Sequence, residues 1–236
     1  MERGSGTFQQ RVVLVGDVSY RYQLWLPPGW SAAGRWPVAL FLHGAGERGD
    51  DGVRPTGVGL GPALREHPER WPLLAVFPQS RDAMGWRRPM LRQALAALDA
   101  VLLDCGGDAR RQYLTGISMG GYGSWRLALD EPDRFAALVP ICGGLDASPL
   151  AIARAGGDPG DPPAAAARIL AHVPTWIFHG ADDRVIPVTE SRVMVEALRA
   201  AGAPVRYTEY PGVGHNAWDR AYAEPELPEW LLAQGP

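Results

Sequence analysis

Apolar and polar residues alternate near the N-terminus of this chain. The alternating stretches cover residues 10–15 and 20–26, and Gly-Asp-Val-Ser separates them. Alternation is typical of strands with one exposed face, and a short polar connection favours a tight turn. We therefore predict an antiparallel hairpin at the start of the chain.

Later apolar runs are continuous instead of alternating, which is typical of strands covered on both faces in a mostly parallel sheet. We expect strands within residues 37–44, 72–79, 112–116, 136–144, 173–180 and 204–212. Segments with a helical spacing of apolar residues lie between or after these runs, at 61–71, 89–104, 120–132, 189–202 and 218–234. Alternating strands and helices predict an α/β fold with a mostly parallel central sheet and helices on both faces.

The interval 147–174 is the one stretch of low complexity, rich in Ala, Pro and Gly. It is too short for a separate lid domain, although it can shape the rim of a pocket. A length of 236 residues suits a single α/β domain. We therefore predict one domain over residues 1–236, with no large lid.

Charge and cysteine content narrow the class of partner. The chain has 23 basic and 26 acidic residues and a net charge of -3, which does not favour nucleic acid or an anionic membrane. No apolar run reaches the length of a membrane span or a signal peptide, so we expect a soluble, cytoplasmic protein. Cys105 and Cys142 lie beside apolar or glycine residues, and we expect buried free thiols. A small neutral molecule is the expected partner.

The segment 113–125, YLTGISMGGYGSW, has the spacing G-x-S-x-G around Ser118. Ser118 follows a predicted strand and precedes a predicted helix, as in a nucleophile elbow. Gly116 and Gly120 would leave room for that sharp turn, and the positive end of the helix would favour developing negative charge. The alternative is a serine in an ordinary glycine-rich turn.

A serine nucleophile needs a base. His215 lies in the loop after the last predicted strand, whereas His43 and His179 directly precede glycines at strand ends. An isolated histidine usually has a structural role, but a loop at this edge of the sheet is where a base is required. We predict that His215 is the base.

Three aspartates could orient that base. Asp183 lies three residues after Gly180 and four before Pro187, in a loop that leaves its strand. Asp182 is its neighbour and would point elsewhere, and Asp146 follows the preceding strand, a position that also serves in some hydrolases. We predict Asp183 as the acid, with the other two as alternatives.

Stabilising a tetrahedral oxyanion takes two backbone N–H donors. We expect one from Met119, directly after the serine, and one from Ala45 in the turn HGAGERG. The side chain of His43 would then hold this turn by hydrogen bonds. Trp86 and Trp218 are candidate walls of the substrate pocket, although a tryptophan is more often a packing residue.

The chain resembles the α/β-hydrolase superfamily in five segments, in order and spacing. They are FLHGAGERGDD, AVFPQ, YLTGISMGGYGSW, FHGADDRVIPV and YPGVGHNAWD, within residues 36–222. The resemblance is to the single-domain carboxylesterase and phospholipase-like group, which includes proteins labelled predicted peptidases or dienelactone-hydrolase-like. It implies the α/β-hydrolase fold, Ser118 as nucleophile, Asp183 as acid, His215 as base, and Ala45 and Met119 as oxyanion donors. Dienelactone hydrolases proper use a cysteine nucleophile, so the serine here does not imply that activity.

These observations predict a serine carboxylic-ester hydrolase that forms an acyl-enzyme with small or aryl esters and needs no metal or organic cofactor. Two alternatives remain open. The same machinery could cleave peptides, although no feature for binding a peptide terminus is evident. The fold could also be a noncatalytic binding module, although such proteins typically lose a triad residue.

Overall fold

The structure is a computed structural model that describes residues 5–81, 85–146, 152–153 and 156–235. Its centre is an eight-stranded sheet in the order β1-β2-β4-β3-β5-β6-β7-β8. The strands are β1 (Thr7–Val15), β2 (Val18–Leu26), β3 (Trp36–Leu42), β4 (Leu74–Pro78), β5 (Gly107–Ile117), β6 (Ala137–Ile141), β7 (Thr175–Gly180) and β8 (Val205–Tyr210).

The sheet is antiparallel at one edge and parallel elsewhere. β1 pairs with β2, and β2 with β4, in antiparallel fashion, and the remaining neighbours are parallel. Val15 faces Val18 across the hairpin turn, where Gly16 has a φ of 60° that favours glycine. The predicted N-terminal hairpin and mostly parallel sheet are confirmed.

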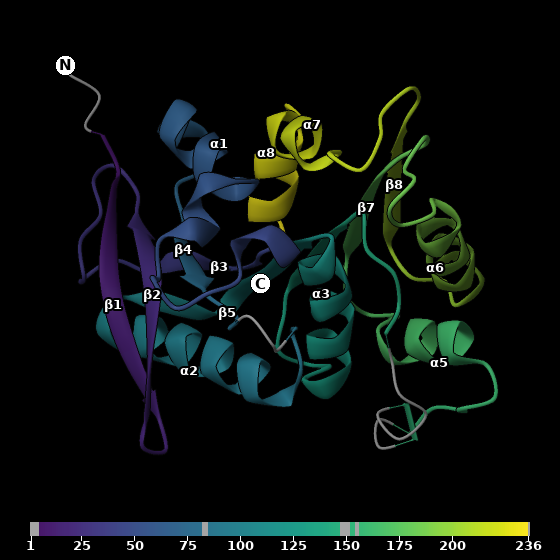
Figure 1. The fold of residues 1–236 in the computed structure, drawn as a ribbon, viewed down its shortest axis with the longest axis horizontal. Coiled ribbons are helices and arrows are strands. Elements are labelled where there is room, and N and C mark those ends of the chain that lie inside the picture. Colours follow the sequence, from purple (N-terminus) through teal and green to yellow (C-terminus); the bar gives the residue numbers. More distant parts are fainter. Residues whose placement is uncertain (1–4, 82–84, 147–151, 154–155, 236) are drawn as a thin grey trace.

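Helices cover both faces of the sheet (Figure 1). One face carries α2 (Arg88–Asp104), α3 (Met119–Asp130), α5 (Pro162–Ile169) and α6 (Thr189–Ala200). The other face carries α1 (Leu60–Glu66), α7 (Trp218–Ala223) and α8 (Leu227–Leu232). Short 3₁₀ helices are η1 (Ala45–Glu47), η2 (Arg54–Gly57) and η3 (Pro68–Arg70).

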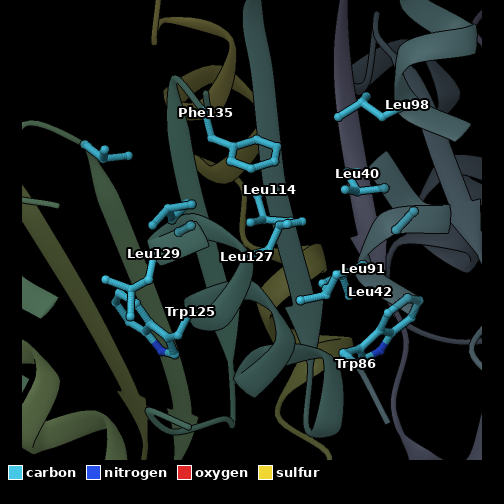
Figure 2. Packing of buried hydrophobic residues seen from close by; sticks show 14 of the residues in the cluster. Leu40, Leu42, Trp86, Leu91, Leu98, Leu114, Trp125, Leu127, Leu129 and Phe135 are labelled. Atoms are coloured by element: carbon cyan, nitrogen blue, oxygen red, sulfur yellow. The ribbon is translucent and has the colours of Figure 1, made fainter. Parts of the chain in front are cut away.

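The continuous apolar runs contribute residues to two hydrophobic clusters, one on each side of the sheet. Along β3, Leu40 and Leu42 belong to the cluster under α2 and α3, whereas Ala39 and Phe41 belong to the cluster under α1 and α7. Figure 2 shows part of the first cluster, with Leu40 from the sheet and Leu127 from α3. All four β3 residues are at most 1% exposed, and burying each leucine contributes about 2 kcal/mol to folding.

Proline breaks two of the predicted helices. The segment 61–71 divides into α1 and η3 at Pro68, and the segment 218–234 divides into α7 and α8 near Pro225. Proline lacks the N–H that would continue the helix and disfavours helical geometry in the residue before it. β5 is also longer than predicted and begins at Gly107, in a stretch whose charged residues mask its strand pattern.

In the interval 147–174, residues 147–151 and 154–155 lie outside the described residues. The described part contributes α5, which lies beside α6 in Figure 1. Cys105 and Cys142 are free and buried, as predicted. Among the residues that the structure describes, no helix is both long and apolar enough to cross a membrane.

Candidate active site

Ser118 forms the sharp turn between β5 and α3. Its backbone has φ 52° and ψ −116°, an unusual conformation for a residue with a side chain. A Cβ added at Gly116 would lie 2.3 Å from the carbonyl oxygen of Gly120, and one added at Gly120 would lie 1.8 Å from that of Leu42. The two glycines therefore allow the turn to pack against the end of β3, which holds the strained serine in place.

His215 lies between β8 and α7 and contacts Ser118. Its Nε2 is 2.8 Å from the Ser118 Oγ, and its Nδ1 is 2.7 Å from the Asp183 Oδ2. The carboxylate can only accept, so Nδ1–H donates to Asp183 and Nε2 accepts from the serine hydroxyl. The imidazole is 20% exposed at the side chain, which leaves the pair open to a substrate.

The Asp183 side chain is completely buried at the end of β7. Its Oδ1 accepts the N–H groups of Val185 at 2.8 Å and Ile186 at 2.9 Å. Burial alone would raise the pKa of this carboxyl, but the hydrogen bonds from His215, Ile186 and Val185 outweigh it and hold the pKa below its ordinary value. Asp183 is therefore an anion at neutral pH.

The alternative acids lie elsewhere. Asp182 is exposed, and its backbone N–H donates to the carbonyl oxygen of Val213. Asp146 is exposed and forms an ion pair with Arg126 at 3.3 Å. Of the three candidates, Asp183 is the one that accepts the hydrogen bond from His215.

Both predicted oxyanion donors are the first residues of helices near the serine. Met119 begins α3 and Ala45 begins η1, and the first N–H groups of a helix have no partner within that helix. Gly44, just before Ala45, is close to the nucleophile, since a Cβ added there would lie 3.7 Å from the Ser118 Cβ. The turn that contains Ala45 therefore packs close to the nucleophile, and Met119 follows it directly in the chain.

The His43 side chain supports the turn at Ala45. Its Nδ1 is 2.6 Å from the Gly44 carbonyl oxygen, and its Nε2 is 2.9 Å from the backbone nitrogen of Ser80. Burial lowers the pKa of His43 to about 4, so the ring is neutral at pH 7. These contacts agree with the structural role that the sequence predicts for His43.

Beside Met119 lies a pocket of about 450 Å³. Its lining is mixed, with apolar and charged side chains, and consists of Gly85, Trp86, Arg87, Met119, Tyr122, Gly123, Leu145, Asp146 and Glu190. Trp86 is 4% exposed and its indole N–H donates to the His43 carbonyl oxygen at 2.9 Å, so it both lines the pocket and packs in the core. Figure 2 shows it beside Leu42.

Trp218 has a different position from Trp86. Its ring meets the His215 ring edge-on, with centroids 5.4 Å apart. It packs against the cluster under α1 and α7 and is not part of the lining of the described pocket. Its direct contact is with the imidazole.

One side chain at this site was not singled out from the sequence. His179, at the end of β7, lies 3.3 Å from the Asp183 Oδ2 through its Nε2. The signal was the dipeptide His-Gly three residues before the predicted acid, but the same dipeptide also follows β3. Only the structure separates the two.

Among the described residues, one group of three side chains could offer ligands to a metal. The ligand atoms of Cys142, Asp183 and His215 lie within 4.8 Å of one another. However, burial raises the pKa of Cys142 to about 12, and Asp183 and His215 are hydrogen-bonded to each other. Both ring nitrogens of His215 already have hydrogen-bond partners, in Asp183 and Ser118, so these atoms are engaged in the series of hydrogen bonds described above.

Comparisons with known proteins agree with this arrangement. Residues 78–225 match the dienelactone hydrolase family. A poly(3-hydroxyoctanoate) depolymerase of Pseudomonas fluorescens is 36% identical over 227 residues, which cover 86% of this chain and 75% of that protein.

Solved structures with similar folds include a thermostable esterase and FphF, a fluorophosphonate-binding serine hydrolase of Staphylococcus aureus. The esterase has a TM-score of 0.76 and 29% identity over 97% of this chain, which spans 63% of the esterase chain. FphF has a TM-score of 0.73 and 19% identity over 98% of this chain and 100% of its own, which shows the shared fold. Because the family match runs from the end of β4 past His215, and so includes Ser118 and Asp183, this chain belongs to the dienelactone hydrolase family.

Proposed function

We propose that this protein is a serine carboxylic-ester hydrolase that works through an acyl-enzyme. The observation that carries the proposal is the series of hydrogen bonds from the Ser118 hydroxyl through His215 to the buried Asp183. A serine hydroxyl becomes an effective nucleophile when a base of fixed tautomer accepts its proton. Kinship with a depolymerase and a structural likeness to an esterase support ester hydrolysis.

In the proposed reaction, the Ser118 Oγ attacks the ester carbonyl carbon while His215 Nε2 takes the hydroxyl proton. The N–H groups of Ala45 and Met119 stabilise the oxyanion, and Asp183 stabilises the imidazolium. The carbon–oxygen bond to the alcohol then breaks, and the alcohol leaves with the proton from His215. Water repeats the sequence on the acyl-enzyme and regenerates the serine.

The pocket beside Met119 supports small or medium-sized esters. Its volume of about 450 Å³ would hold part of a small molecule, and Trp86, Met119 and Leu145 offer apolar surface to an alkyl or aryl group. The named relative acts on a polyester with alkyl side chains, which is compatible with such a pocket. We propose p-nitrophenyl esters of short and medium acyl chains as model substrates.

A fluorophosphonate probe tests the nucleophile, because its phosphorus forms a stable tetrahedral adduct with an activated serine. We expect one label per chain on Ser118, and none on the Ser118→Ala variant. Ser124 is a useful internal control, since it lies on the next turn of α3 but its hydroxyl donates to the Gly120 carbonyl oxygen at 2.9 Å. Labelling of Ser124, or none in folded protein, would contradict the mechanism.

Hydrolysis assays test the reaction class. The panel compares p-nitrophenyl esters of increasing acyl length with aminoacyl anilides, with and without EDTA. We expect turnover of esters that is insensitive to the chelator. Faster cleavage of anilides would favour a serine peptidase, activity that zinc restores after chelation would favour a metallohydrolase, and labelling without turnover of any substrate would contradict the proposed esterase.

A further inference from the structure

The Asp183 carboxylate has a second histidine neighbour in addition to His215. His179 is the next-to-last residue of β7, and its side chain and that of Asp183 are both 0% exposed. The His179 Nε2 is 3.0 Å from the Ile186 carbonyl oxygen and 3.3 Å from the Asp183 Oδ2. That carboxylate oxygen is the one that accepts from His215.

The hydrogen-bond partners determine which nitrogen of His179 carries the proton. Nε2 faces the Ile186 carbonyl oxygen and the Asp183 carboxylate, which can only accept, so Nε2 must be the donor. Nδ1 lies 2.7 Å from the Ser191 Oγ, whose hydroxyl can donate to it. Burial lowers the pKa of His179, which keeps the ring neutral with a single proton on Nε2.

We propose that His179 is a positioning residue for the acid of the triad: its Nε2–H holds the Asp183 Oδ2 in the orientation that accepts from His215, and Ser191 holds the His179 ring in the required tautomer. This inference rests on the proposed ester hydrolysis for its kinetic consequences. With this role for His179, the series of contacts runs from Ser191 through His179, Asp183 and His215 to Ser118.

Three hydrogen bonds and one further close contact from a ring nitrogen surround the buried carboxylate and explain how its position is maintained. Val185 and Ile186 hold Oδ1 through their N–H groups, while His215 and His179 approach Oδ2. Without His179, Oδ2 would depend on His215 alone, and the carboxylate could rotate away while His215 moves during proton transfer. Misplacement of a catalytic group by about 1 Å can cost about 10²-fold in rate.

The His179 dipole also influences the charge that His215 senses. An N–H group aimed at Oδ2 offsets part of the negative potential that this oxygen exerts on the imidazole. Its removal would favour the protonated, inactive form of His215. The acid limb of the kcat/KM profile should then move to higher pH when the donor is lost.

Other titratable groups near these residues do not produce such a shift. Cys142 and Tyr122 interact with the Asp183 charge, and Glu209 interacts with His179. Burial raises the pKa of Cys142 to about 12 and also raises that of Tyr122, so both stay neutral. The hydrogen bond from Arg192 lowers the pKa of Glu209 to about 2, so this carboxylate stays charged throughout the range of interest.

Two substitutions separate positioning from packing. His179→Leu removes the donor and fills the space with an apolar side chain, whereas the amide nitrogen of His179→Gln can replace Nε2–H. For His179→Leu we expect kcat to fall about tenfold with KM within about twofold, because one hydrogen bond to a charged group is lost. We expect the acid limb to rise by about 0.5 to 1 pH unit in the same variant. His179→Gln should restore kcat to within about threefold of wild type and return the acid limb to its original position.

Wild-type protein gives an independent test that needs no substrate. A long-range ¹H–¹⁵N spectrum of the histidine rings reports the tautomer, and we expect His179 to carry its proton on Nε2 between pH 6 and 8. A proton on Nδ1, or a doubly protonated ring, would overturn the inference even if His179→Leu does not fold. Unchanged kcat and pH profile in a folded His179→Leu variant would overturn it as well. Absence of esterase activity in the wild type would instead contradict the proposed function.

Discussion

The dipeptide His-Gly directly follows β3 and also forms the last two residues of β7, and the two histidines are used in opposite ways. His43 and His179 are both 0% exposed. His43 donates through Nδ1 to the Gly44 carbonyl oxygen and accepts at Nε2 from the Ser80 N–H. His179 accepts at Nδ1 from Ser191 and donates through Nε2 to the Ile186 carbonyl oxygen. The two rings therefore have opposite tautomers.

This difference shows what each turn contributes to the site. The partners of His43 are backbone groups, so this residue supports the turn that contains Ala45. The partners of His179 include a charged side chain, so this residue acts on the charge that orients His215. In the proposed mechanism, the first of these segments positions a backbone donor and the second positions a carboxylate.

The largest effect is expected from a substitution of Asp183, the charged residue in the turn after β7. Asp183→Asn keeps the shape of the side chain but removes its charge and can favour the wrong His215 tautomer. The corresponding substitution in a serine protease lowers kcat by about 10⁴. Asp182→Asn is the matched control, because its side chain is exposed, and should stay within about tenfold of wild type. The assay is kcat for both variants and for Asp146→Asn, with circular dichroism to verify folding. If Asp182→Asn or Asp146→Asn is the inactive variant, our assignment of the acid is wrong.

The second largest effect is expected from a substitution that removes the Ala45 N–H, the proposed donor in the turn after β3. Ala45→Pro deletes the N–H at the first position of η1, where proline is sterically acceptable after the extended Gly44. Loss of one oxyanion donor should lower kcat by about 10² to 10³ with little change in KM. Gly46→Ala keeps the N–H and has open space around its new methyl group, so it should behave like wild type. Equal activity of Ala45→Pro and Gly46→Ala would exclude Ala45 as a donor.

The pH dependence of the free energy of unfolding tests whether the buried ring of His43 is neutral. Its pKa is about 4 in the folded protein and 6.5 without burial, so between these values the unfolded chain binds more protons. The free energy of unfolding should therefore be highest above pH 6.5 and fall by about 3 kcal/mol toward pH 4. Burial of His179 acts in the same direction.

Urea unfolding between pH 4 and pH 7.5 measures this slope. His43→Gln cannot titrate, so it should be less sensitive to acid than wild type while His179 continues to contribute. An identical pH dependence of wild type and His43→Gln would show that His43 is not the buried neutral ring that its contacts indicate.

The smallest expected effects concern the tryptophan behind each turn. Trp86→Phe loses the hydrogen bond to the His43 carbonyl oxygen and should lower the free energy of unfolding by about 1 kcal/mol. Trp218→Phe keeps an aromatic edge against His215 and should cost less than about 0.5 kcal/mol. Denaturant unfolding compares the two, and the kcat/KM ratio of aryl to alkyl esters should change more for Trp86, which lines the pocket. A larger change in this ratio for Trp218 would make it the wall of the substrate pocket.

Much of the fold follows from local patterns along the chain. The N-terminal hairpin and the buried strands were predictable because the spacing of apolar residues reflects which faces of a strand are covered. The turn at Ser118 was predictable because the steric demand for glycine acts within a few residues. Helix ends were less predictable, since Pro68 and Pro225 each divide a segment whose apolar spacing continues past the break.

The candidate site was predictable as a set because parallel strands bring their carboxyl ends to one edge of the sheet. Ser118, Asp183 and His215 each follow a strand that ends there, although Ser118 and His215 lie 97 residues apart. The sequence alone thus determined which residue types could meet. The identity of the acid among three aspartates depended on which carboxylate the fold buries beneath the imidazole.

The two His-Gly dipeptides show which features of the site depend on nearby residues and which depend on the tertiary structure. The sequence determined that each histidine lies at or directly after the carboxyl end of a buried strand, because a continuous apolar run precedes it. Only the tertiary structure decided their tautomers. Ser80 lies 37 residues from His43, in the segment after β4, whereas Ser191 comes from α6. A neutral imidazole takes its proton on whichever nitrogen faces an acceptor, and the acceptors are chosen by packing between distant segments.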